Sequence, residues 1–150
     1  MNYRKQEVVG ILLCVIALFI LLSFITYNPL ESPSGLSSEV SRNNIMGLFG
    51  IYISYYIMKF SFGWGSFFIP IILFLIGINL FTRKKMQGIL QLSFFLIGLG
   101  IWVSVLIAWI GYYKGGFWIA EYPGMLGYLI FVFFKNVIGI YASGFLQIIF

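Results

Sequence analysis

The chain contains no histidine, no aspartate and a single cysteine, Cys14, among its 150 residues. A Ser-His-Asp triad needs the first two of these, a structural zinc site needs several cysteines or histidines, and a disulfide needs a second cysteine. The inventory therefore excludes all three kinds of site within this sequence. A Gly-x-x-x-x-Gly-Lys motif is also missing, so these residues bind no nucleotide through a P-loop. We expect no metal, cofactor or catalytic residue here.

Charged residues are scarce as well, at 9% of the chain, whereas 61% of residues are hydrophobic and 21% aromatic. About a quarter of the residues in an ordinary soluble domain are charged. The stretch from Val8 to Tyr27 carries no charge at all. A helix of that length spans the ~30 Å hydrocarbon core of a bilayer. The composition therefore predicts an all-α integral membrane protein, and Cys14, in mid-span, is expected to be a buried free thiol.

The few basic residues indicate the topology, because Lys and Arg that flank a span remain on the cytoplasmic side. They form one group before the first span and another in the middle of the chain: Arg4 and Lys5, then Arg83, Lys84 and Lys85. Both groups are predicted to be cytoplasmic, so an even number of spans lies between them. The segment from Asn28 to Asn44, with two prolines and a charge of minus one, is predicted to be an exported loop.

This topology predicts a four-span helical bundle with spans over residues 8–27, 64–82, 87–113 and 137–150, of which the fourth is truncated. Two outer interfacial helices are expected over residues 45–60 and 124–134. Lys59 is expected to snorkel from the first of them toward the lipid headgroups. Ser61 to Gly63 is the expected bend, and Pro70 the expected kink in the following span.

Short sequences recur along the chain. Gly10 to Leu12 returns as Gly88 to Leu90, and Met46 to Gly50 is echoed by Pro123 to Gly127, at offsets of 78 and 77 residues. Each copy would contain a span, an outer loop, an interfacial helix and a second span. Both copies would start and end inside, which makes this a parallel internal repeat. The alternative is a chance match between glycine-rich apolar segments.

Small residues gather at spacings that place them on one helix face, where they allow membrane helices to approach closely. The third span carries five of them, the first interfacial helix three and the bend one: Ser93, Gly100, Ser104, Ala108 and Gly111; Gly47, Gly50 and Ser54; and Gly63. These residues are candidates either for packing within one subunit or for contacts between subunits.

The sequence Ser-Phe-Ile-Thr-Tyr-Asn-Pro from Ser23 to Pro29 is followed by Asn-Ile-Met-Gly-Leu-Phe-Gly from Asn44 to Gly50, then by Phe62-Gly63 and Pro70. In order and spacing, these motifs resemble the N-terminal membrane domain of the FtsK/SpoIIIE DNA translocases. That domain has four spans with both ends in the cytoplasm. The chain departs from the family at Glu31-Ser32-Pro33, where Asp-Pro is frequent, and it lacks the family's linker and ATPase motor.

The resemblance implies a fragment that anchors a DNA translocase in the bacterial inner membrane, at the division septum, during cell division and chromosome partition. These residues would not be an enzyme, whereas the full-length protein would be an ATP- and Mg-dependent motor on double-stranded DNA. The implied partners are the lipid bilayer, further copies in a hexamer, and division-site membrane proteins, with DNA bound only by the missing motor. Two alternatives stay open: a small permease or channel subunit, and a stand-alone structural membrane protein whose exported loop binds a partner.

Overall fold

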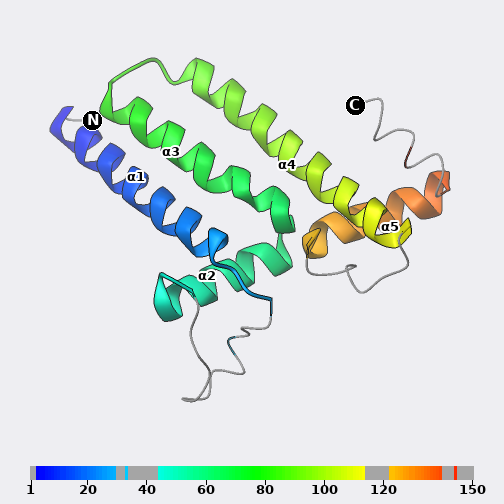
Figure 1. Cartoon of the computed structure of the whole chain (residues 1–150). Helices are drawn as coiled ribbons and strands as arrows, with labels where there is room; N and C mark the ends of the chain where they lie inside the picture. Colours follow the sequence, from blue (N-terminus) through cyan, green and yellow to red (C-terminus); the bar gives the residue numbers. More distant parts are fainter. Residues whose placement is uncertain (1–2, 30–32, 34–43, 114–121, 140–143, 145–150) are drawn as a thin grey trace. The chain divides into compact units, whose positions relative to one another are not determined.

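Figure 1 shows the computed structural model of the chain, which describes residues 3–29, 33, 44–113, 122–139 and 144. The regular structure in these ranges is entirely helical. It comprises α1 (Tyr3–Ile25), α2 (Gly47–Phe60), the 3-10 helix η2 (Gly63–Phe67), α3 (Phe68–Phe81), α4 (Gln87–Tyr113) and α5 (Gly124–Ile138). The prediction of an all-α protein is confirmed.

Three helical stretches in the described part are long and apolar enough to cross a membrane: Arg4–Ile25, Gly63–Phe81 and Gln87–Tyr113. They overlap the first three predicted spans, over residues 8–27, 64–82 and 87–113. The 14 residues of α2 and the 15 of α5 are shorter. At 1.5 Å per residue these two helices reach only about 22 Å, which does not cross a hydrocarbon core of ~30 Å. The fourth predicted span lies outside the described residues except for 137–139 and 144.

The structure differs from the sequence-based expectation at Pro70, which is not the site of a kink within a helix. Pro70 is the third residue of α3, where a missing N–H leaves no helical hydrogen bond unmade. The 3-10 helix η2 precedes it, over Gly63–Phe67. A second difference concerns α5, which continues four residues past the expected end at 134. It stops only where Gly139 adopts a φ of 87°.

The described residues divide into two compact units, and the first comprises Met1–Ser54 and Phe67–Gly98. Its main feature is the antiparallel pair formed by α1 and α3, which lie side by side (Figure 1). A Cβ atom on Gly10 would lie only 2.7 Å from the carbonyl oxygen of Gly77 and from the backbone nitrogen of Phe81. The half-buried Cys14 Sγ lies 3.9 Å from the carbonyl oxygen of Phe74. Glycine thus brings the two backbones into direct contact, with the free thiol beside them.

The second unit comprises Tyr55–Ser66 and Leu99–Phe150. It contains the end of α2, all of η2, the C-terminal half of α4, and α5. Its apolar core forms between α4 and α5, where Val105 and Ala108 pack with Phe131. Phe131 is 1% exposed, so α5 is held against α4 by a large side chain inserted between them.

The backbone contact between α1 and α3 predicts that Gly77→Ala destabilises the protein. The added Cβ would lie 2.7 Å from Cys14 Sγ and 2.9 Å from the Gly10 carbonyl oxygen. Overpacking of this kind lowers the free energy of unfolding by about 1–3 kcal/mol. Unfolding in mixed detergent micelles, followed by tryptophan fluorescence, measures the change. Gly98→Ala is the matched control, since no atom lies within 4 Å of its added Cβ. Equal effects of the two substitutions would contradict the helix contact.

Candidate functional site: a glycine junction

Two glycines with positive φ face each other where the end of α2 meets the start of α5. Gly63 has a φ of 54° and Gly124 a φ of 71°, values that side chains rarely adopt. A Cβ on Gly63 would also lie 2.6 Å from the backbone nitrogen of Gly124, so no other residue fits. We call this site the glycine junction and define it as Ser61–Ser66, Gly100, Ser104 and Tyr122–Gly127.

Backbone hydrogen bonds join the two segments on either side of these glycines. The Trp64 N–H donates to the Tyr122 carbonyl at 2.9 Å, and the Leu126 N–H donates to the Ser61 carbonyl at 3.1 Å. All four residues lie at helix ends or in turns, where backbone groups lack partners within a helix. The junction therefore gives irregular backbone the internal hydrogen bonds that a membrane environment requires.

Ser104 fixes the junction to α4. Its side chain is completely buried, and Oγ donates a short hydrogen bond to the Pro123 carbonyl. Gly127, one turn into α5, leaves the space that this hydroxyl fills, because a Cβ there would contact the Ser104 side chain. A small residue on one helix thus accommodates a polar side chain of the other.

The junction lies beside the middle of α4. A Cβ on Gly65 would meet the carbonyl of Gly100, which is the central residue of this 27-residue helix. Gly100 is therefore about 20 Å from either end of a helix that is long enough to cross the bilayer. This contact places the bend beside the middle of α4. The interfacial position of the two short helices stays a prediction, and the ends that meet at the junction lie beside the middle of α4.

Two lysines each donate a hydrogen bond to a tyrosine hydroxyl. Lys59 Nζ donates to Tyr55 Oη at 2.8 Å, one turn back along α2. Lys135 Nζ donates to Tyr112 Oη at 2.9 Å and lies 4.0 Å from the centre of that ring. Tyr112 is the second-last residue of α4, so α5 runs from the middle of α4 near Ser104 to its C-terminal end. Each ammonium thus has a phenol partner.

The two short helices have the same form at an offset of 77 residues. Gly47 and Gly124 both take a positive φ at the helix start. Four exposed apolar residues follow in each helix at matching positions: Leu48, Phe49, Tyr52 and Tyr56 in α2, and Met125, Leu126, Leu129 and Phe133 in α5. This likeness supports the internal repeat. The faces also carry no charge, as contact with lipid tails requires.

The small residues selected from the sequence are nearly all buried within the chain. Those of the third span all lie on the buried face of α4: Ser93, Gly100, Ser104, Ala108 and Gly111. In α2, Gly50 and Ser54 are buried, whereas Gly47 is half-buried with no atom within 4 Å of an added Cβ, so only its φ requires glycine. These residues therefore pack within the chain, whereas contacts between subunits stay a prediction.

Sequence reasoning missed Asn44, whose side chain joins α1 to α2. Its Nδ2 donates to the Ser23 carbonyl at 3.0 Å, and its Oδ1 accepts from the Met46 N–H at 3.0 Å. Gly50 has no room for a Cβ because Asn44 occupies that space. The signal was present in the Asn-x-x-Gly-x-x-Gly motif that starts at Asn44. Gly124 and Gly127 likewise belong to the repeat seen in the sequence, but they were not named as candidates for helix packing.

The five basic residues selected for topology are all exposed and belong to the first unit: Arg4, Lys5, Arg83, Lys84 and Lys85. An ion pair between Arg83 and Glu7 joins the turn after α3 to the first turns of α1. The two basic groups, far apart in sequence, therefore lie at the same end of the α1–α3 pair.

A sequence model of the family described as the 4TM region of DNA translocase FtsK/SpoIIIE matches residues 2–150. The chain belongs to this family. The resemblance inferred from the motifs is thereby confirmed. The DNA translocase FtsK of Rickettsia bellii (strain RML369-C) is 30% identical to the chain over 96 residues, which are 63% of this chain and 13% of that protein. The match thus covers a small part of the relative. No solved structure matches the chain.

The glycine junction predicts that Ser104→Ala is more destabilising than Ser93→Ala, although both serines are buried in α4. Ser104→Ala removes a donor from the buried Pro123 carbonyl. The loss should lower the free energy of unfolding by about 1–2 kcal/mol. Ser93 Oγ bonds only to Ile89 O in its own helix, at 2.7 Å, and that carbonyl already belongs to the helical hydrogen-bond pattern. Unfolding in mixed micelles compares the two, and a larger effect at Ser93 would contradict the role of Ser104.

Proposed function

We propose that these residues form the membrane anchor of an FtsK/SpoIIIE-type DNA translocase that acts at the division septum during chromosome segregation. The observation that carries this proposal is the family match over residues 2–150, together with three helices able to cross a membrane in the described part. The relative in Rickettsia bellii is a DNA translocase, and the match covers 13% of it. In the proposed whole protein, an ATP-driven motor that binds ATP and Mg lies outside this region and is the only part that binds DNA.

The polar side chains favour an anchor over a permease. No glutamate lies within the three spanning stretches except Glu7 in the first turns, and Glu7 pairs with Arg83. Within the described residues, each buried polar side chain makes a hydrogen bond to the protein: Ser23, Asn44, Ser54, Ser66, Asn79, Ser93 and Ser104. A path for ions or polar substrates needs polar groups that face the path. These groups instead stabilise the packing within each unit, as an anchor requires.

The proposed orientation has Arg4, Lys5 and the turn from Arg83 to Lys85 in the cytoplasm of a bacterial cell, because basic flanks remain inside. The family suggests a hexameric ring and contacts with division-site membrane proteins. The exposed apolar faces of α2 and α5 are among the surfaces open to neighbouring subunits or lipid.

The septal role predicts where the protein gathers in dividing cells. The full-length protein, joined to a fluorescent protein, should form a band at mid-cell in cells with a closing septum. Uniform fluorescence around the membrane through the whole division cycle would contradict septum targeting. Colocalisation with a marker of the septum measures the enrichment. An unrelated four-span protein with the same fluorescent tag is the control for the doubled membrane at the septum.

The motor is tested separately, by reading the source DNA beyond the codon for Phe150. The proposal predicts an open frame that continues into a Gly-x-x-x-x-Gly-Lys-Ser/Thr motif. A stop codon directly after Phe150 would contradict the motor and favour a stand-alone membrane protein.

A further inference from the structure

One end of the α1–α3 pair carries an excess of positive charge. Arg4 and Lys5 extend from the first turn of α1, and Arg83 to Lys85 form the turn after α3, all of them exposed. Glu7, which pairs with Arg83, is the one acidic residue in the described part of the chain. This end of the helix pair thus carries one carboxylate and five basic side chains. Among the described residues, no ion pair is formed by the other four basic residues, Arg4, Lys5, Lys84 and Lys85. We call these four residues the basic patch.

The turn that carries half of this patch is fixed from within. Asn79, which is 3% exposed, points its side-chain amide at the turn, with Nδ2 3.4 Å from the Lys84 carbonyl oxygen and 3.0 Å from Met86 Sδ. Its own carbonyl accepts from the Lys84 N–H at 3.2 Å. The Lys84 and Lys85 backbones are therefore held in place before any ligand binds, which lowers the entropy lost on binding.

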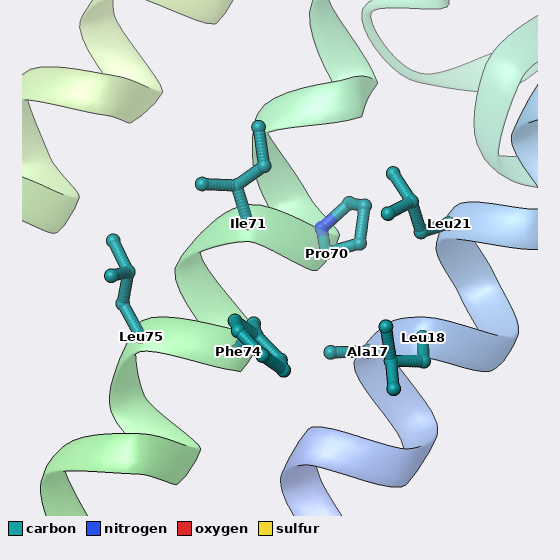
Figure 2. Close-up of a pocket in the computed structure, with 7 residues that line it drawn as sticks. All are labelled: Ala17, Leu18, Leu21, Pro70, Ile71, Phe74 and Leu75. Atoms are coloured by element: carbon teal, nitrogen blue, oxygen red, sulfur yellow. The ribbon is translucent and has the colours of Figure 1, made fainter.

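An apolar groove lies between the same two helices (Figure 2). It has a volume of about 160 Å³ and is lined by apolar residues only: Ala17, Leu18 and Leu21 from α1, and Pro70, Ile71, Phe74 and Leu75 from α3. The groove exists because Ala17 and Pro70 are too short to fill the space that opens beyond the close contact at Gly10 and Gly77. We call it the α1–α3 groove.

The basic patch and the groove lie on one face of α1. Arg4, Ile11 and Leu18 recur every seven residues, which places them along a single side of a helix. Ile11 and Leu18 are exposed, at 52% and 48%. On α3, Phe74, Ile78 and Phe81 are exposed too and lead from the groove toward the basic turn. An exposed apolar track thus joins the groove to the patch on both helices.

We propose that the α1–α3 pair binds an anionic phospholipid, with its phosphate on the basic patch and one acyl chain in the α1–α3 groove. The patch lies within a turn or so of the ends of spanning helices, at the depth of lipid headgroups, and clusters of basic residues there attract anionic lipid. The groove lies farther along the same helices, where acyl chains lie. The positive-inside rule explains the basic residues alone, whereas a bound lipid also accounts for the groove and the track. The proposed orientation places this site in the cytoplasmic leaflet.

Native mass spectrometry of the full-length protein, titrated with lipid in detergent micelles, tests the proposal. The probes are phosphatidylglycerol and phosphatidylethanolamine with identical acyl chains, which differ in net charge. The proposal predicts tighter binding of phosphatidylglycerol. Lys84→Gln/Lys85→Gln should weaken that binding about 25-fold, since each basic residue near an anionic surface contributes a factor of about five. Lys59→Gln/Lys135→Gln removes the same charge elsewhere and should leave the Kd unchanged.

A second variant tests the groove. Ala17→Phe should fill the space between Leu18 and Phe74 and weaken phosphatidylglycerol binding severalfold, with the basic patch intact. Leu12→Phe, at a position that is 58% exposed, is its matched control. If the Lys84/Lys85 variant unfolds, Arg4→Gln/Lys5→Gln replaces it. Equal binding of the two lipids, unchanged binding in the patch variants, or preferential binding of a short DNA duplex to the patch would overturn the proposal.

Discussion

The structure depends on one constraint, that backbone polar groups at hydrocarbon depth must find hydrogen-bond partners inside the protein. α2 and α5 are too short to cross a bilayer, so the chain must turn beside the middle of α4. The segments Ser61–Ser66 and Tyr122–Pro123 bring N–H and C=O groups to that depth that no α-helix pairs. They bond to each other and to Ser104. This is possible only because Gly63 and Gly124 allow the two backbones to touch.

Much of this arrangement could be predicted from the sequence, and the physical reason differs by element. The first three spans follow from apolar length and basic flanks, the bend at Ser61 to Gly63 from a single glycine-containing break, and the buried face of α4 from the spacing of its small residues. Which glycines contact the backbone of another helix could not be predicted, because Gly10 and Gly98 both lie in apolar sequence. Of these two, Gly10 meets another backbone and Gly98 does not. The position of Pro70 within its helix was predicted wrongly, because a proline near a helix start and a proline at a kink have similar local sequences.

Different contacts stabilise the two units of the proposed anchor. The α1–α3 pair combines a glycine contact, a turn fixed by Asn79, and a basic end that suits lipid phosphates. The second unit has α5 held on α4 by Phe131 and by the glycine junction. Neither unit contains an acidic side chain in the middle of a span or a buried polar side chain without a partner, within the residues that the structure describes. Their chemistry serves placement in the membrane, which is the role that family membership supports.

Hydrogen exchange in lipid nanodiscs tests the glycine junction most directly. The amides of Trp64 and Leu126 lie at helix ends, where exchange is normally fast, but here they donate to Tyr122 and Ser61 in a buried site. The account predicts that both amides exchange as slowly as amides in the middle of α4, and that Gly63→Ala speeds their exchange. Exchange as fast as that of the amides of Gln87 and Gly88, two exposed residues in the first turn of α4, would show that no such junction forms in the membrane.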